Sequence, residues 1–147
     1  MRARDLITQV PTVMVDSPVI EAARLMVGRN LPGLIVLDER NRPFTILPGT
    51  QVLRLAVPRY CQDDPTLARV IDEAHADEFV HALGDLTVRQ ALPDQPRELP
   101  VTEPDATVLE VAALMARTRS PIVAVIDRER LLGAVTLNRL MTRLMDA

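Results

Sequence analysis

The chain has 147 residues, of which 48% are apolar, 2% are aromatic and 25% are charged, and its formal net charge is −3 at pH 7. This length and apolar content support one compact domain, or two small halves that share a core. Aromatic rings for stacking on bases are scarce and the basic residues are scattered, so the composition argues against nucleic acid and anionic membranes as partners.

All 17 basic residues are arginines. Without lysine, the sequence cannot supply a phosphate-loop lysine, a Schiff-base lysine or a Ser-Lys nucleophile pair. The single cysteine, Cys61, allows neither an internal disulfide nor a multi-cysteine zinc site, so we expect a cytoplasmic protein in which Cys61 is a buried structural residue. The N-terminus lacks an apolar signal core and no apolar run approaches the ~20 residues of a membrane span, which predicts that the chain does not insert into a membrane.

An internal repeat organises the sequence. Residues 21–38 align with residues 110–127 at a constant offset of 89 without a gap, and seven of the 18 aligned positions are identical. The identical pairs are Glu21/Glu110, Ala23/Ala112, Leu25/Leu114, Met26/Met115, Pro32/Pro121, Val36/Val125 and Asp38/Asp127. The repeat predicts two homologous units.

The first unit, residues 1–57, contains a short extended segment at 12–15. Ser17 followed by Pro18 then predicts the start of a helix, with Ser17 as its N-cap, and apolar residues at helical spacing up to Met26 predict one buried face. The apolar run at 34–37 predicts a strand that is covered on both faces. Residues 44–47 predict a second strand, and a last helix is expected from about Thr50.

Residues 58–85 have no counterpart in the repeat and are expected to form a helical insertion. Pro65 after Asp64, with apolar residues at helical spacing behind it, predicts one helix, and a second is expected from Ala76 to Leu83. The stretch carries an excess of acidic residues, so we expect a solvated acidic face that is a candidate partner-binding surface. Those residues are Asp63, Asp64, Asp72, Glu73, Asp77, Glu78 and Asp85. His75 and His81 lie among them without a metal-ligand motif, so no metal site is predicted.

The second unit, residues 86–147, repeats the first. Its extended segment is 99–101, and either Asp105 or Thr107 is expected to cap the helix whose apolar positions run to Met115. Strands are predicted at 122–126 and 132–135. A final helix from Leu137 carries a stripe that its spacing predicts to be buried, made of Leu137, Leu140, Met141 and Leu144.

Each unit is therefore predicted to have the order β-α-β-β-α. Neither unit is large enough to bury its own faces, so the two should pack against each other around one pseudo-symmetric core. The expected fold class is α/β (α+β), with two tandem motifs packed as a pseudo-twofold pair and a helical insertion between them.

These features, taken twice and in the same order, resemble the CBS family of paired regulatory motifs, the Bateman modules. The matching segments of the second unit are 88–92, 108–115, the strand introduced by Ser120 and Pro121, Asp127, and 131–136. The resemblance implies the tandem fold and adenosine-containing ligands, such as AMP, ADP, ATP or S-adenosylmethionine, in clefts between the motifs. It also implies that backbone groups near the Pro-bearing strand hold adenine, and that a Ser or Thr and an Asp three residues later hold the ribose.

The two units depart from that ribose pattern. In the second unit the hydroxyl is present as Thr136, but Arg139 stands at the Asp position; in the first unit Pro48 and Gln51 occupy the two places. The candidate ligand-binding residues of the second unit are Val101, Thr102, Ser120, Pro121, Ile122, Thr136 and Arg139. A weaker first-unit cleft comprises Leu31, Pro32, Gly33 and Gln51.

Two interpretations of the second-unit residues stay open. Thr136 and the Arg139 guanidinium could hold a phosphate or another anion at the start of the last helix. Alternatively, Thr136 only caps that helix and Arg139 points to water.

Three functions compete. The leading one is a regulatory sensor in which a ligand shifts the packing of the two motifs and so acts in trans on a separate partner, such as a transporter or an enzyme. The alternative is a ligand-free structural or dimerisation subunit with degenerate nucleotide sites. An enzyme ranks last, because no nucleophile–base pair, carboxylate dyad or metal cluster can be identified. A homodimer is expected, since the pair should leave the stripe from Leu137 to Leu144 partly uncovered.

Overall fold

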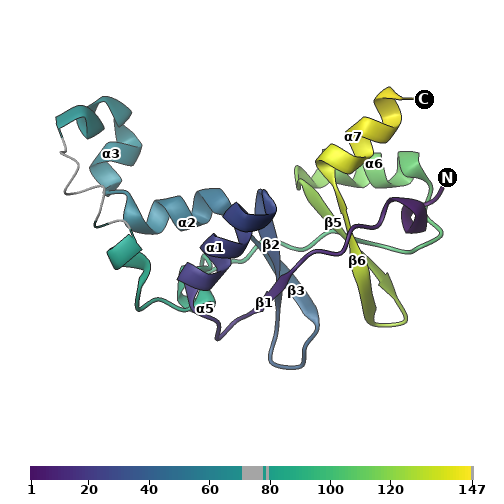
Figure 1. Ribbon diagram of the computed structural model, residues 1–147, viewed down its shortest axis with the longest axis horizontal. Coiled ribbons are helices and arrows are strands. Elements are labelled where there is room, and N and C mark those ends of the chain that lie inside the picture. The colour runs from purple at the N-terminus through teal and green to yellow at the C-terminus, as the bar shows by residue number, and fades with distance from the viewer. Residues whose placement is uncertain (71–77, 79, 147) are drawn as a thin grey trace.

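The first unit has the predicted order of elements. The computed structural model describes residues 1–70, 78 and 80–146 (Figure 1). In the first unit it places strand β1 (Thr12–Met14), helix α1 (Val19–Arg29), strands β2 (Gly33–Leu37) and β3 (Pro43–Pro48), and helix α2 (Gly49–Ala56). Strand β1 pairs with β2 in parallel and β2 with β3 in antiparallel fashion. Four of the five β2 residues are buried, as the unbroken apolar run predicts.

The second unit repeats this arrangement. It contains strand β4 (Val101–Thr102), helix α6 (Val108–Thr118), strands β5 (Ile122–Asp127) and β6 (Arg130–Thr136), and helix α7 (Leu137–Met145). Its sheet again has one parallel and one antiparallel pairing. Both antiparallel pairings shift register at the same repeat position, after Val36 in one unit and after Val125 in the other. The tandem β-α-β-β-α prediction is confirmed.

In the described part of the chain the hydrophobic core consists of three clusters, one in each unit and one between them. The shared cluster joins Ile35 and Ile46 of the first unit with Ile122, Ala124 and Ala134 of the second. These side chains project from β2, β3, β5 and β6, so the two sheets face each other across a common interior. This shared core fixes the boundary between the units, where the candidate site lies.

The opening segment of each unit packs on the other unit. The 3₁₀ helix η1 (Ala3–Leu6) places Ala3 and Leu6 in the core of the second unit, and helix α5 (Val88–Ala91) places Val88 and Ala91 in the core of the first. Backbone bonds hold both crossings: the Ala3 N–H donates to the Ala106 carbonyl at 2.8 Å, and the Val88 N–H donates to the Ser17 carbonyl at 2.8 Å. Each unit is therefore completed by a segment from the other half of the chain.

The N-terminal segment continues along β6. Thr8 exchanges two backbone hydrogen bonds with Ala134, at 2.8 and 3.1 Å, and the Gln9 side chain donates to the Leu132 carbonyl at 2.8 Å. Gly133 lies beneath this segment at a φ of +150°, where a Cβ would lie 2.5 Å from the Ile7 side chain. The close approach of the segment requires glycine at that position.

The insertion is helical in the parts that are described. It contains helix α3 (Arg59–Asp63) and the 3₁₀ helix η2 (Pro65–Val70), and residues 80–83 are also helical. Cys61 is buried, as predicted. The predicted continuation through Ile71 and Ala74, the start of the second helix at Ala76, and the residues Asp72, Glu73, His75 and Asp77 lie outside the described residues.

The structure shows which residues cap helices α1 and α6. Helix α6 is capped by Thr107 rather than Asp105: the Thr107 hydroxyl accepts from the Glu110 N–H at 3.1 Å, and the Glu110 carboxylate accepts from the Thr107 N–H at 2.7 Å. The prediction for Ser17 is wrong. The N-cap of α1 is Pro18, and the Ser17 hydroxyl instead accepts from the Met14 N–H at 3.0 Å, because it turns back toward β1.

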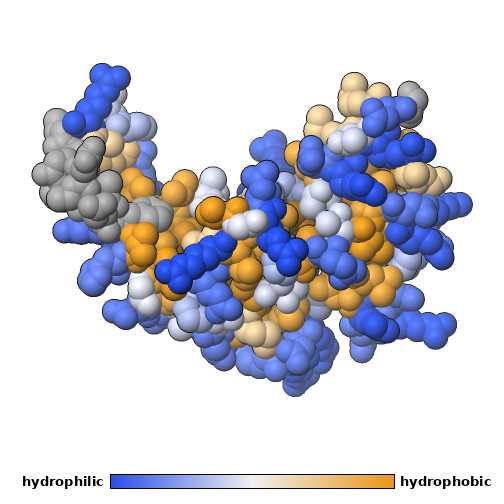
Figure 2. All heavy atoms as spheres, viewed as in Figure 1, coloured by the Kyte–Doolittle hydropathy of each residue, from blue (hydrophilic) through white to orange (hydrophobic). Residues whose placement is uncertain are grey.

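The apolar stripe on α7 is only partly buried. Leu140 is 2% exposed, whereas Leu137, Met141 and Leu144 are 43–50% exposed. The prediction from spacing that all four side chains are buried is therefore wrong, because only Leu140 reaches the core of the unit, whereas the expectation that the stripe from Leu137 to Leu144 is partly uncovered agrees with these exposures. In the space-filling view, hydrophobic residues reach the surface between hydrophilic ones across both halves of the visible face (Figure 2). Within the described residues, no helix combines the length and apolar character needed to cross a bilayer.

Candidate functional site

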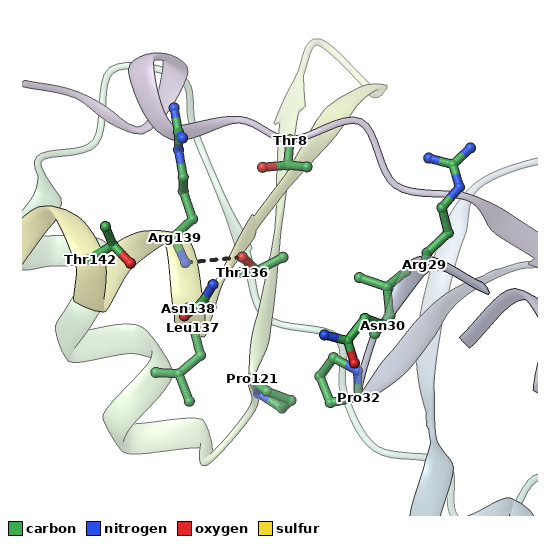
Figure 3. A pocket seen from close by; sticks show the side chains of 11 residues that line it. Thr8, Arg29, Asn30, Pro32, Pro121, Thr136, Leu137, Asn138, Arg139 and Thr142 are labelled. Atoms are coloured by element: carbon green, nitrogen blue, oxygen red, sulfur yellow. Dashed lines mark hydrogen bonds between the residues drawn. The ribbon is translucent and has the colours of Figure 1, made fainter. Parts of the chain in front are cut away.

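A cavity of about 650 Å³ lies at the boundary between the two units. Its walls come from the end of α1 and the loop before β2 in the first unit, from the start of β5 and the first turns of α7 in the second, and from the N-terminal segment (Figure 3). The lining residues are Thr8, Arg29, Asn30, Leu31, Pro32, Pro121, Thr136, Leu137, Asn138, Arg139 and Thr142. Its size falls in the range of small-molecule sites.

The structure merges residues that the sequence assigns to two clefts. Leu31 and Pro32, predicted for the first-unit cleft, share this cavity with Pro121, Thr136 and Arg139 of the second. The separation into two independent clefts is wrong for these residues, because the facing sheets bring the loops before β2 and β5 to the same boundary.

The remaining first-unit candidates do not line this cavity. Gly33 is buried, and a Cβ there would lie 2.9 Å from the Leu47 carbonyl oxygen. The Gln51 side chain donates to the Ala91 carbonyl at 2.9 Å, which ties α2 to α5. Gln51 therefore has a structural partner within the fold.

Four second-unit candidates do not line this cavity, and two of them, Val101 and Thr102, lie at a separate hollow. Val101 and Thr102 line a separate hollow of about 420 Å³ beside Arg2, Asp105 and Glu110. They sit on β4, at the edge of the second sheet, and are not brought together with Arg139.

The other two are Ser120 and Ile122: the Ile122 side chain is buried in the core shared by the two units, and the Ser120 hydroxyl is hydrogen-bonded to the Ile122 backbone. Ser120 is buried; its hydroxyl donates to the Ile122 carbonyl at 2.7 Å and accepts from the Ile122 N–H at 3.3 Å. The Pro121 carbonyl accepts from the Leu137 N–H at 2.9 Å. The backbone groups that the family resemblance assigns to adenine are thus already paired inside the fold.

Thr136 caps helix α7 and also faces the cavity. Its Oγ accepts from the Arg139 N–H at 3.2 Å, shown as the dashed line in Figure 3. The capping interpretation of Thr136 is therefore correct. The cap uses the oxygen as an acceptor, so the hydroxyl proton is left to donate to a ligand.

Two arginines give the cavity its charge. Arg139 stands on the α7 wall and Arg29 on the opposite α1 wall, with both side chains running toward the end of the cavity where Thr8 lies (Figure 3). Within the described part of the chain neither guanidinium has an ion-pair partner, and none of the lining residues is acidic. The cavity is therefore a positive site on a chain of net charge −3.

Sequence reasoning missed Arg29, Asn30 and Thr8. Arg29 and Asn30 end α1, where Asn30 adopts the left-handed conformation (φ 53°) of a C-cap, and the sequence pattern shows only a helix end. The repeat does contain a signal for Asn30, because it aligns with Arg119, the residue just before the candidates Ser120 and Pro121. The structure gives Arg119 the same left-handed conformation, with a φ of 55°.

A second hollow, of about 550 Å³, lies between α6 and α7. Its lining is mostly apolar and includes Met115, Leu140, Met141 and Leu144, together with Arg119 and Ser120. It contains the exposed part of the α7 stripe and is called the α6/α7 groove below.

Comparison with known proteins identifies similar chains. The family model of the CBS domain matches residues 3–47 and 96–146. A CBS domain-containing protein from Kribbella flavida is 50% identical, with 99% of each chain covered and a TM-score of 0.85. No curated protein matches the sequence.

Two further solved structures share the fold at low identity. The CBS domain of a CBS domain-containing membrane protein from Sphaerobacter thermophilus is 22% identical, covering 97% of this chain and 86% of that one, with a TM-score of 0.69. CBSX2, a CBS-pair protein of Arabidopsis thaliana, was solved in complex with AMP; that structure is 17% identical, covers 99% and 97% of the two chains and has a TM-score of 0.69. No catalytic family is indicated by these comparisons.

Proposed function

The chain belongs to the CBS domain family, and from that premise we propose that it is a regulatory module that binds an adenine nucleotide or a related anion in the cavity between its two motifs. The observation that carries the proposal is the composition of the cavity wall. Residues of the first motif, the second motif and the N-terminal segment line one space, and the described lining residues include two arginines and no acidic side chain.

A ligand in such a cavity would act by stabilising one arrangement of the motifs. Arg29 and Pro32 belong to one motif and Thr136 and Arg139 to the other, so an occupant gains all its contacts only when the motifs are correctly packed. A ligand with different affinities for two arrangements shifts the equilibrium between them by that difference. The response would be read by a separate protein, such as a transporter or an enzyme.

The adenine nucleotide class is supported by two considerations. CBSX2, which has the same fold, was solved with AMP. The cavity has the volume for a nucleotide-sized ligand, and its guanidinium groups suit phosphate oxygens.

Self-association is part of the proposal. The α6/α7 groove exposes Leu137, Met141 and Leu144, and we propose that a second copy of the chain covers it through the same surface. A twofold contact suits this surface, because the outer face of α7 in each copy would be a ridge that packs into the groove of the other copy. The output of the sensor would then pass through the dimer to its partner.

The alternative is a ligand-free scaffold that uses only this dimer surface. The observation that favours it is the set of internal hydrogen bonds at the family's ligand positions: Gln51 with the Ala91 carbonyl, and Ser120 with Ile122. Those groups are satisfied without a ligand.

Thermal unfolding in the presence of AMP, ADP, ATP and S-adenosylmethionine separates the two functions. A ligand at 100 times its Kd stabilises the folded state by about 2.7 kcal/mol, which raises Tm. The sensor predicts that at least one nucleotide raises Tm and that Arg139→Gln reduces the rise, whereas Arg143→Gln, an equal charge change on the same helix outside the cavity, does not. If none of the four ligands raises Tm, the scaffold function replaces the sensor.

A further inference from the structure

Among the residues that the structure describes, the charged groups lining the cavity are one guanidinium on each wall. Arg29 ends α1 in the first motif, and Arg139 lies in the first turn of α7 in the second. The other polar lining side chains are neutral: Thr8, Asn30, Thr136, Asn138 and Thr142. A ligand that enters meets positive charge from two independent parts of the fold.

On this basis we infer that Arg29 and Arg139 clamp a ligand carrying two or more phosphate groups, and that the site recognises the phosphate chain rather than the sugar. The inference rests on the proposed function and narrows its ligand class to polyphosphates, with or without a nucleoside.

The two guanidinium groups favour a ligand with more than one negative charge. Both arginines are exposed and stand on opposite walls of the cavity, so an anion between the walls can pair with both guanidinium groups. Each guanidinium offers several N–H donors in a planar fork that matches phosphate oxygens. A ligand with one phosphate can satisfy one arginine fully, whereas a chain of phosphates supplies separate charges to both walls. A cavity of about 650 Å³ has room for such a chain.

The neutral groups of the wall favour the same ligand. Thr136 accepts the Arg139 N–H through one lone pair of its oxygen, so its O–H stays available to donate a hydrogen bond to a ligand. The Thr8 and Thr142 hydroxyls and the Asn30 and Asn138 amides also provide donors. The positive end of the α7 dipole lies on the same wall. Donors and positive potential favour acceptor-only oxygens, which is the chemistry of phosphate.

The cavity offers little to a sugar. The two hydroxyls of a ribose are best held by a carboxylate that accepts from both, and none of the lining residues is acidic. Arg139 occupies the position where the family resemblance places that carboxylate, and a guanidinium accepts no hydrogen bond. A nucleoside without phosphate therefore finds no strong partner.

The test is a calorimetric titration of the intact chain with orthophosphate, pyrophosphate, tripolyphosphate, adenosine and ATP. The variants are Arg29→Gln and Arg139→Gln. Their controls are Arg24→Gln on α1 and Arg143→Gln on α7, which change the charge equally at positions outside the cavity. The melting temperature of each variant confirms that it is folded.

For the unmodified chain we expect affinity to rise along the phosphate series, ATP to bind about as tightly as tripolyphosphate, and adenosine to give no heat. Each cavity variant should lower the affinity for tripolyphosphate about tenfold, equivalent to the loss of one charge-assisted contact. The affinity of each variant should also rise less steeply with the number of phosphate groups. The affinity of the control variants for tripolyphosphate should stay within about twofold of that of the unmodified chain, as expected for charges remote from the ligand.

Two results would overturn the clamp while leaving the proposed function intact: a loss from Arg139→Gln with no loss from Arg29→Gln, or adenosine binding as tightly as ATP. Failure of every phosphate compound to bind the unmodified chain would overturn the clamp, and if AMP, ADP and S-adenosylmethionine also left Tm unchanged, the proposed function would fall with it.

Discussion

Substitution of Gly133 by alanine should destabilise the protein by interrupting the crossing of the N-terminal segment over β6. At a φ of +150° an alanine is strained, at a cost of about 1–3 kcal/mol. Its Cβ would also lie 2.5 Å from the Ile7 Cγ2 and 2.9 Å from the Thr8 carbonyl oxygen. The side chain can rotate away, but the backbone oxygen cannot move without disturbing the Thr8–Ala134 hydrogen bonds.

Those two hydrogen bonds contribute about 0.5–1.5 kcal/mol each. The expected loss in the free energy of unfolding is therefore about 2–6 kcal/mol, a large share of the roughly 5–15 kcal/mol of a typical domain. Urea denaturation followed by circular dichroism measures it. The amide of Thr8 should also lose protection from hydrogen exchange, because its bond to the Ala134 carbonyl is broken.

Gly28→Ala is the matched control. Gly28 lies on α1, and apart from the backbone of the helix itself no atom comes within 4 Å of the position that a Cβ would take there. Alanine at this position should therefore stabilise the helix by up to about 1 kcal/mol. If Gly133→Ala cost less than about 1 kcal/mol, below the lower end of the strain expected from its backbone alone, the tight crossing at β6 would be refuted.

Three other predictions concern the cap, the dimer and an exposed ion pair. Thr136→Ala removes the α7 cap and should cost about 1 kcal/mol in chemical denaturation, whereas Thr136→Ser should restore it; equal stability of both variants would contradict the capping role. If the proposed dimer forms, Met141→Glu should convert it to a monomer in sedimentation experiments at micromolar concentrations, while Leu109→Glu, at an exposed α6 position outside the groove, should not; a monomeric unmodified chain would rule out the proposed dimer. The hydrogen bond from Arg89 holds the pKa of the Glu39 carboxyl below its ordinary value of 4.5. Because the pKa is lowered in the folded state, the stabilisation is present above pH 4.5 and is lost as the pH falls through the folded pKa. Glu39→Gln should remove this small, salt-sensitive part of the pH dependence of the free energy of unfolding. An unchanged pH dependence would show that the pair contributes nothing.

The repeat in the sequence predicts the fold well because its signals are local. Apolar spacing from Val108 to Met115 and the β-branched run from Ile122 depend on neighbouring residues, and the structure has a helix and a strand there. Agreement between two copies strengthens each prediction. The exchange of opening segments was not predictable in this way, because which core accepts Leu6 or Val88 depends on contacts between distant parts of the chain.

The candidate site was predicted only in part for the same reason. Thr136 and Arg139 stand out because the family resemblance places the ribose-binding hydroxyl and carboxylate at these two positions. Arg29 reaches the cavity only because the two sheets face each other, which no local pattern expresses. Val101 and Thr102 are also candidates from the sequence, but they lie on β4, the edge strand of the second sheet, and line a separate hollow.

The two motifs are proposed to hold one ligand together at their common boundary. Hydrogen exchange measured by mass spectrometry, with and without saturating ATP, tests this claim most directly, because binding lowers the exchange of the segments that contact the ligand. We expect joint protection of peptides that contain Thr8, Asn30 and Arg139, with no change around Gln51. Protection confined to one motif, or centred on Gln51, would contradict it.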